Sequence, residues 1–218
     1  MTLAAPEKEN ILWLPPSRQP AMRKVLVIVA LLAIGVLLAW TLPPLPGSRG
    51  VAGYLPLHTL LETVAIVIAM LVFAVGWNAY SEKIPGSIVL LACAFFGVGI
   101  LDFTHQMSYA GMPDFITPGS PDKSINFWLS ARTLAAVALL ISAIIPWRPF
   151  ASNITRYALL AGTCVLVVAI HWLYLFHFEL MPVTFIPGKG LTQFKVNYEY
   201  VLIALNLITA LLLWLRMQ

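Results

Sequence analysis

Eight ionisable side chains lie inside long apolar stretches of this sequence, and they belong to types that bind metals, protons or polar ligands. They are His58, Glu62, Asp102, His105, Arg132, His171, Lys195 and Glu199. An ionisable group inside a bilayer is costly and usually serves a function. Imidazole and carboxylate groups ligate metal ions, and imidazole titrates near neutral pH. The residue types therefore indicate a polar site enclosed by apolar segments.

The spacing of these residues predicts that they act in pairs. The pairs are His58/Glu62, Lys195/Glu199 and Asp102/His105. Residues three or four apart on a helix are neighbours on one face. Because a lipid-facing pair of polar groups would be expensive, each pair is expected to face the interior of a bundle.

The charges of the deep residues do not balance. Glu62, Asp102 and Glu199 oppose the single cation Arg132. In a medium of low dielectric, such a site must take up protons, charge a histidine or bind a cation. Arg132 could instead form a buried ion pair with Asp102 or Glu62 that only fixes helix packing.

The excess of carboxylate and imidazole groups over the single cation Arg132 favours a metal ion or a haem as the ligand over an organic molecule. His58 and His105 are the best candidate metal ligands, and Glu62 and Asp102 would either ligate the ion or orient the histidines. A proton-sensing site fits the same residues. His58 could also be interfacial, as could Lys195, since polar side chains near helix ends reach the headgroups.

The composition places most of the chain in lipid. Of its 218 residues 60% are hydrophobic and 10% are charged, whereas soluble domains carry about 25% charged residues. A spanning helix needs about 20 mostly apolar residues. The qualifying segments are 25–42, 55–80, 87–109, 126–147, 157–177 and 194–216. We therefore predict an all-α, polytopic membrane bundle of about six transmembrane helices over 25–218, preceded by a cytoplasmic tail over 1–24.

Five of these segments place a polar group at a similar depth. Glu62, Asp102, Arg132, His171 and Glu199 each lie roughly 8–10 Å from the same side of the membrane, at 1.5 Å per residue. The other half of the bundle is apolar. His171 is as compatible with a satisfied core histidine as with a ligand.

Lysine and arginine set the orientation. With the amino terminus in the cytoplasm, the inner residues are Lys8, Arg18, Arg23, Lys24, Lys83, Arg148, Arg156 and Arg216, and the outer residues are Arg49, Lys123, Lys189 and Lys195. The positive-inside rule then predicts a multi-pass protein of the bacterial inner membrane with both termini cytoplasmic. The net charge of +4 is thus a topology signal, and no nucleic-acid partner is expected.

Four motifs occur in one order along the chain. They are LHTLLET at 57–63, LDFTH at 101–105, WLSAR at 128–132, and PGKGLT at 187–192 running on to FKVNYEY at 194–200. Together they resemble the third type of bacterial membrane-associated sensor (MASE) domain, over about residues 50–218. The resemblance implies an input module that is not itself an enzyme. It also implies a cytoplasmic output domain, carboxy-terminal to the module, of the histidine kinase (two-component) or diguanylate cyclase (cyclic di-GMP) type.

The resulting hypothesis is a sensor that works as a homodimer in the lipid bilayer. Ligand at the outer polar site would shift the sixth helix, which leaves the membrane at Arg216. Since the chain ends at Gln218, an output domain is expected to be separate or missing.

Two alternative functions remain. Histidines and carboxylates could hold zinc with an open water position, as in an integral membrane metalloenzyme (a hydrolase), although no helix carries histidines four apart. A small transporter would need polar groups through the full membrane depth.

Overall fold

The structure is a computed structural model that describes residues 19–41, 54–81 and 83–216, and these residues are almost entirely helical. Its elements are α1 (Gln19–Thr41), α2 (Tyr54–Asn78), α3 (Gly86–Met107), α4 (Pro121–Ile144), α5 (Ile154–Phe176), the short 3₁₀ helix η2 (Phe178–Leu180), β1 (Phe185–Ile186), β2 (Gly190–Leu191) and α6 (Gln193–Arg216). The all-α fold class predicted from the sequence is confirmed.

Five helices, α2 to α6, are long and apolar enough to cross a membrane. The sixth expected span, 25–42, falls on α1, where the apolar stretch among the described residues is Val27–Leu38, too short to qualify. Most of the tail expected over 1–24 lies outside the described residues, and its last residues, 19–24, are helical; the boundary at residue 24 stays a prediction. The chain divides into two units, residues 1–52 and 53–216, with α1 in the first.

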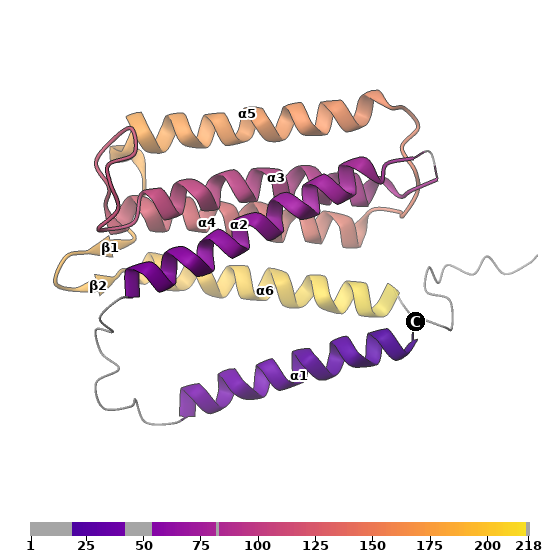
Figure 1. The fold of residues 1–218 in the computed structure, drawn as a ribbon, viewed down its shortest axis with the longest axis horizontal. Helices are drawn as coiled ribbons and strands as arrows, with labels where there is room; N and C mark the ends of the chain where they lie inside the picture. Colours follow the sequence, from indigo (N-terminus) through magenta and orange to yellow (C-terminus); the bar gives the residue numbers. More distant parts are fainter. Residues whose placement is uncertain (1–18, 42–53, 82, 217–218) are drawn as a thin grey trace, which may run out of the picture. The chain divides into compact units, whose positions relative to one another are not determined.

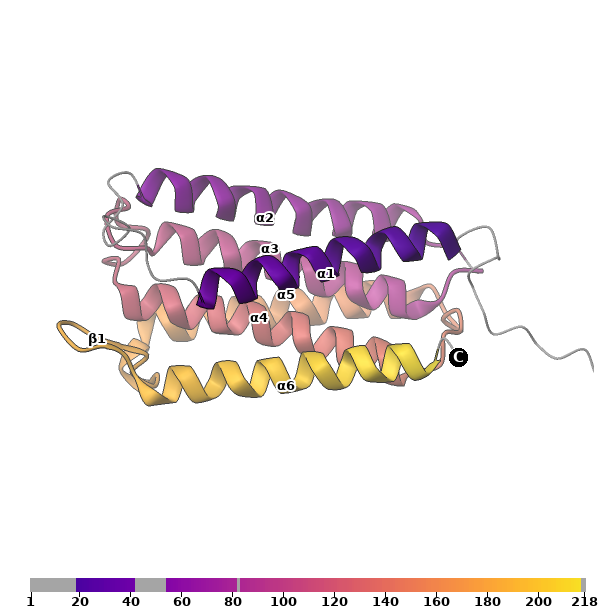
Figure 2. The ribbon, with the colours of Figure 1, turned by 90° about the horizontal axis from the view of Figure 1, so that it is seen from below.

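Within the second unit, α3 and α4 pack against each other at the centre, α2 and α5 pack on α3, and α6 packs on α4 (Figures 1 and 2). The main core cluster lies between these helices and includes Leu101, Phe127 and Val167. Accordingly α3 is the most buried span, while α2, α5 and α6 expose most of their apolar surface. That exposed surface is what lipid or a protein partner would cover.

Close approach of the helices depends on two glycines of α3. A Cβ atom at Gly97 would lie 2.8 Å from Leu134 of α4, and one at Gly99 would lie 2.8 Å from Met70 of α2. Small residues at helix contacts are typical of membrane bundles. Both glycines therefore serve close helix packing.

Helix α4 begins earlier than predicted. It starts at Pro121 instead of residue 126, because Ser120 caps it and accepts a hydrogen bond from the backbone nitrogen of Lys123 at 3.1 Å. Serine followed by proline is a favourable start for a helix. Arg132 consequently lies about 16 Å along α4 at 1.5 Å per residue, and not the roughly 9 Å expected.

A β-hairpin joins α5 to α6. Strands β1 and β2 are antiparallel, and Gly188 and Gly190 have φ values of 79° and 89°, which favour glycine. The carboxylate of Asp122 at the start of α4 accepts hydrogen bonds from the backbone nitrogen of Thr184 at 2.6 Å and from its hydroxyl. The hairpin is thereby attached to α4. We call this end of the bundle, where α2, α4 and α6 begin, the hairpin end.

Candidate functional site

Three predicted site residues meet near the hairpin end of α2 and α3. One potential ligand atom from each of His58, Glu62 and His105 lies within 4.8 Å of the other two. The Nε2 atom of His105 is 3.9 Å from Oε1 of Glu62, and their side chains are only 7% and 17% exposed. We call these three residues the triad. The i,i+4 pairing of His58 with Glu62 is what places both on the face of α2 that meets α3.

The first turn of α4 orients His105. The Nδ1 atom of His105 lies 2.8 Å from the backbone oxygen of Ser124. Because a carbonyl oxygen can only accept a hydrogen bond, Nδ1 is the donor. The Ser124 hydroxyl lies 2.9 Å from the same nitrogen and donates to the backbone oxygen of His105 at 3.0 Å. In the neutral imidazole, the lone pair is then on Nε2, which faces Glu62.

Neighbouring contacts hold the two helices in register at this level. The side-chain amide of Gln106 donates to the backbone oxygen of Thr59 at 2.9 Å and to the hydroxyl of Thr63 at 3.0 Å. The ring of His58 stacks on Tyr109, with centroids 4.3 Å apart, and meets the His105 ring edge-on at 5.7 Å. The triad is therefore preorganised by protein groups alone.

Asp102 and Arg132 form a separate ion pair between α3 and α4. One guanidinium nitrogen of Arg132 is 3.1 Å from both carboxylate oxygens of Asp102. The Asp102 side chain is 1% exposed, whereas that of Arg132 is 35% exposed, so Arg132 is less shielded within the described residues than expected. Among the described residues, the ion pair of Glu62 is with His105 and not with Arg132.

The third predicted pair lies on α6. Lys195 and Glu199 are 2.7 Å apart, and Trp128 of α4 has Lys195 over its ring at 5.7 Å and Arg132 at 5.6 Å. Trp128 thus links the α6 pair to the Asp102–Arg132 pair. A cavity of about 440 Å³ between α4 and α6 is lined by Trp128, Arg132 and Glu199 together with Asn206, Tyr200 and apolar residues.

His171 does not join the triad. Its Nε2 atom lies 2.7 Å from the hydroxyl of Thr104 and its Nδ1 atom lies 2.8 Å from the backbone oxygen of Val167. Its ring also packs against Phe127, with centroids 5.1 Å apart. Both ring nitrogens are engaged, which is the environment of a satisfied core histidine.

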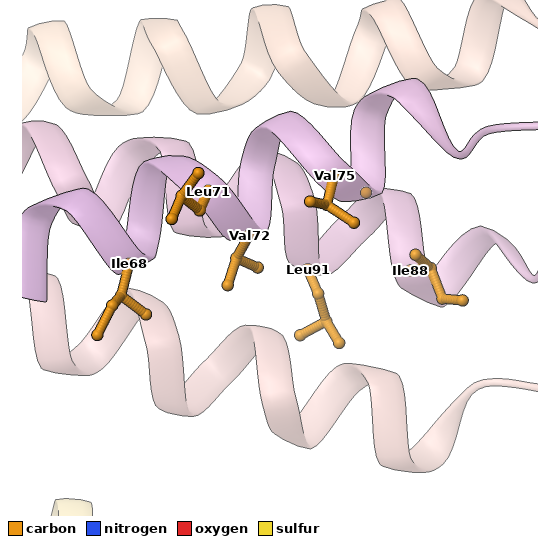
Figure 3. A pocket seen from close by; sticks show the side chains of 7 residues that line it. Ile68, Leu71, Val72, Val75, Ile88 and Leu91 are labelled. Atoms are coloured by element: carbon orange, nitrogen blue, oxygen red, sulfur yellow. The ribbon is translucent and has the colours of Figure 1, made fainter.

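Two other cavities are almost wholly apolar. One lies between α2 and α3 and is lined by residues such as Ile68, Val72 and Leu91 (Figure 3). The other lies between α3 and α5 and includes His171, whose nitrogens are already bonded. Neither offers the convergent polar groups that fix a ligand's orientation.

Several residues of this region were missed from the sequence. Ser124 and Gln106 orient the triad, and Asp122 attaches the hairpin. The stretch from Ser120 to Pro121 carried a usable signal, since it marks a helix start that would have placed Asp122 and Ser124 in the first turn of α4. Nothing in the sequence shows that the Ser124 carbonyl bonds His105, because every residue has such a group.

The fold and the polar site together define a polytopic membrane module with a buried polar cluster near one end. A family model described as a membrane-associated sensor domain, MASE3, matches residues 50–218. The chain therefore belongs to the MASE3 family, as its four motifs suggested. No curated protein and no solved structure matches it.

Proposed function

We propose that this membrane sensor module detects its signal at the triad and transmits it through α6 to a carboxy-terminal output domain. The observation that supports this is a series of polar contacts between α2 and α6 that includes one step along the backbone of α3. His105 of the triad lies one turn from Asp102 on α3. Asp102 pairs with Arg132, and Arg132 and Lys195 both lie over the ring of Trp128. A change at the triad therefore has a physical path to the outer half of α6.

Arg216 attaches the opposite end of α6 to α4. One guanidinium nitrogen of Arg216 donates to the backbone oxygens of Ala143 at 3.0 Å and Ile145 at 2.7 Å. The guanidinium also lies 4.5 Å from the ring centre of Trp147. We call this set of contacts the α6 clamp. It holds the last turn of α6 against the end of α4, where an attached output domain would respond to its release.

Signalling would follow if ligand binds the clamped and released bundles with different affinity. A ligand shifts a conformational equilibrium only by as much as its affinities for the two states differ. The output domain would be of the histidine kinase or diguanylate cyclase type, as in the arrangements that the MASE resemblance implies. The same resemblance supports a non-catalytic role for the chain itself.

We further propose that the hairpin end faces outward across the bacterial inner membrane and that α1 is the sixth span, with both termini cytoplasmic. The opposite end carries basic and aromatic anchors, such as Arg156, which lies within 5.0 Å of the ring centres of Trp77, Tyr80 and Tyr157. Arginine and lysine near the ends of spans favour the cytoplasmic side.

Topology reporters test this orientation. Fusions after Arg148 and after Gln218 should both report a cytoplasmic location, and one after Lys189 should report the periplasm. A periplasmic signal at either of the first two positions would reverse the bundle and move the triad to the cytoplasmic half.

A homodimer through α6 is the arrangement that would pass the signal to paired output domains. On the exposed face of α6 lie Leu207, Leu211 and Trp214, each more than half exposed, whereas Thr209 is 3% exposed. Single cysteines at the three exposed positions, in a chain with Cys93 and Cys164 replaced by alanine, should crosslink between subunits in native membranes.

A cysteine at position 209 is the matched control and should not crosslink. Glu62→Gln should alter the relative crosslinking at the three exposed positions, because it changes the charge of the triad. If none of the positions crosslinks, α6 is not at a subunit interface. If crosslinking occurs but its relative extent at the three positions is unchanged by Glu62→Gln, the proposed path from the triad to α6 is wrong.

A further inference from the structure

We propose that His58, Glu62 and His105 form a three-ligand site for a divalent transition ion of the zinc type. The inference rests on the proposed function, since the ion would either be the signal itself or bind the ligand that is the signal. It rests on geometry as well, because three ligand atoms from two helices converge within 4.8 Å of one another.

The distance between His105 and Glu62 is close to that in an occupied site, and the ligand atom of His58 lies within 4.8 Å of both. With bonds of about 2.0–2.1 Å to nitrogen and oxygen, two ligands of a tetrahedral zinc ion lie ~3.4 Å apart. The 3.9 Å between His105 Nε2 and Glu62 Oε1 would close to this value by a shift of about half an ångström, from the same geometry. Rotation of the Glu62 side chain alone can supply such a shift.

The surroundings of His105 are those of a metal-ligating histidine. Its Nδ1–H donates to the Ser124 backbone oxygen, and a ligating imidazole almost always donates its other N–H to a carbonyl or carboxylate. This bond directs the Nε2 lone pair of the neutral ring toward the Glu62 carboxylate. Two electron-rich groups then face each other, and a cation between them converts that repulsion into attraction.

The carboxylate of Glu62 is short of partners. Its Oε2 atom is buried and has no hydrogen-bond partner among the described residues. The nearby cation Arg132 is engaged by Asp102, which is 1% exposed. With neutral histidines the triad therefore carries a negative charge that a bound cation would compensate.

The donor set selects the kind of ion. Two imidazoles and one carboxylate suit zinc and similar borderline ions, whereas calcium and magnesium require mostly oxygen ligands. Three protein ligands leave a fourth position for water or an exogenous ligand. Haem fits less well, because Glu62 lies 3.9 Å in front of His105 Nε2, in the space that the macrocycle would need.

Metal titration of the full chain in lipid nanodiscs tests the site. After chelator treatment and removal of the chelator, Zn²⁺ is titrated by calorimetry and Co²⁺ by absorption spectroscopy. We expect one ion per chain and the ligand-field bands of a tetrahedral or five-coordinate Co²⁺ site. His58→Ala, His105→Ala and Glu62→Gln should each weaken binding at least tenfold and change the Co²⁺ spectrum.

Two variants outside the triad are matched controls. Glu199→Gln removes a carboxylate charge on α6, and His177→Ala removes a histidine beyond the end of α5. Both should bind Zn²⁺ like the unmodified chain. The melting temperature without metal shows whether each variant folds, and Zn²⁺ should raise it only where the triad is intact.

Absence of stoichiometric binding in the unmodified chain would overturn the metal site, as would binding that survives all three triad substitutions. Neither result would contradict the proposed function, because the Glu62→Gln crosslinking pattern tests that function without metal. Conversely, if the chain binds metal but α6 does not respond, the metal site is correct and its role in signalling is wrong.

Discussion

Arg132→Leu is expected to destabilise the bundle by about 3–5 kcal/mol, the usual cost of leaving one partner of a buried ion pair without the other. The stranded group is Asp102, whose side chain is 1% exposed and whose two oxygens both face the guanidinium of Arg132. Denaturation in mixed micelles measures the loss of unfolding free energy. The effect should be large because no other cation is paired with Asp102 among the described residues.

The double variant Asp102→Leu with Arg132→Leu provides the decisive comparison. It removes both charges and should recover most of the lost stability, since replacing a buried pair by apolar residues is often neutral or better. Lys195→Leu is the matched control and should cost less, because its partner Glu199 is 31% exposed. An unchanged stability in Arg132→Leu would show that the pair does not support the fold.

Arg216→Gln is expected to release the α6 clamp. It removes the charge over Trp147 and shortens the side chain that reaches the last carbonyl groups of α4. In a full-length protein, output should then become independent of Glu62→Gln and of added metal. Trp147→Leu should have the same effect in weaker form, since it removes only the cation–π contact, worth about 0.5–2 kcal/mol. Output that still responds fully to the triad in Arg216→Gln would show that the clamp is not the transmitting contact.

The sequence was sufficient to locate five helices that are long and apolar enough to cross a membrane. Apolar runs of about 20 residues predicted α2 to α6 within a few residues, apart from the start of α4. Intramembrane charge predicted that the polar groups gather near one end. Both signals arise because lipid cannot form hydrogen bonds with the chain. Backbone groups must therefore be hydrogen-bonded within helices, and charged side chains must face the protein interior instead of lipid.

The partners within the polar layer could not be predicted in the same way. Asp102 and His105 are three residues apart and were expected to act together, but at about 100° per residue their directions differ by about 60°. Because α3 lies between α2 and α4, this difference is enough to send His105 to Glu62 and Asp102 to Arg132. Position along a helix is readable from the sequence only where the helix start is also readable, which failed for Arg132 on α4, whereas the angle around the helix depends on how neighbouring helices are arranged.

His171 illustrates the same limit. Its depth matched that of the other polar residues, yet α5 packs on α3 on a side where Thr104 is available, and Thr104 lies one residue before His105. A threonine inside a span carries little signal, because its hydroxyl is usually satisfied by its own helix. Here it bonds the Ile100 backbone oxygen and also meets His171.

We expect a change at the triad to move the clamped end of α6 relative to α4. Spin labels at Ile141 of α4 and Leu211 of α6, both on exposed positions, report that distance by pulsed electron paramagnetic resonance in nanodiscs. Saturating Zn²⁺ should shift the distance distribution in the unmodified triad and leave it unchanged in His105→Ala. Labels at Ile141 and Ile88 of α3 should show no shift in either case. A chain that binds Zn²⁺ at the triad while its α4–α6 distribution stays the same would contradict the account.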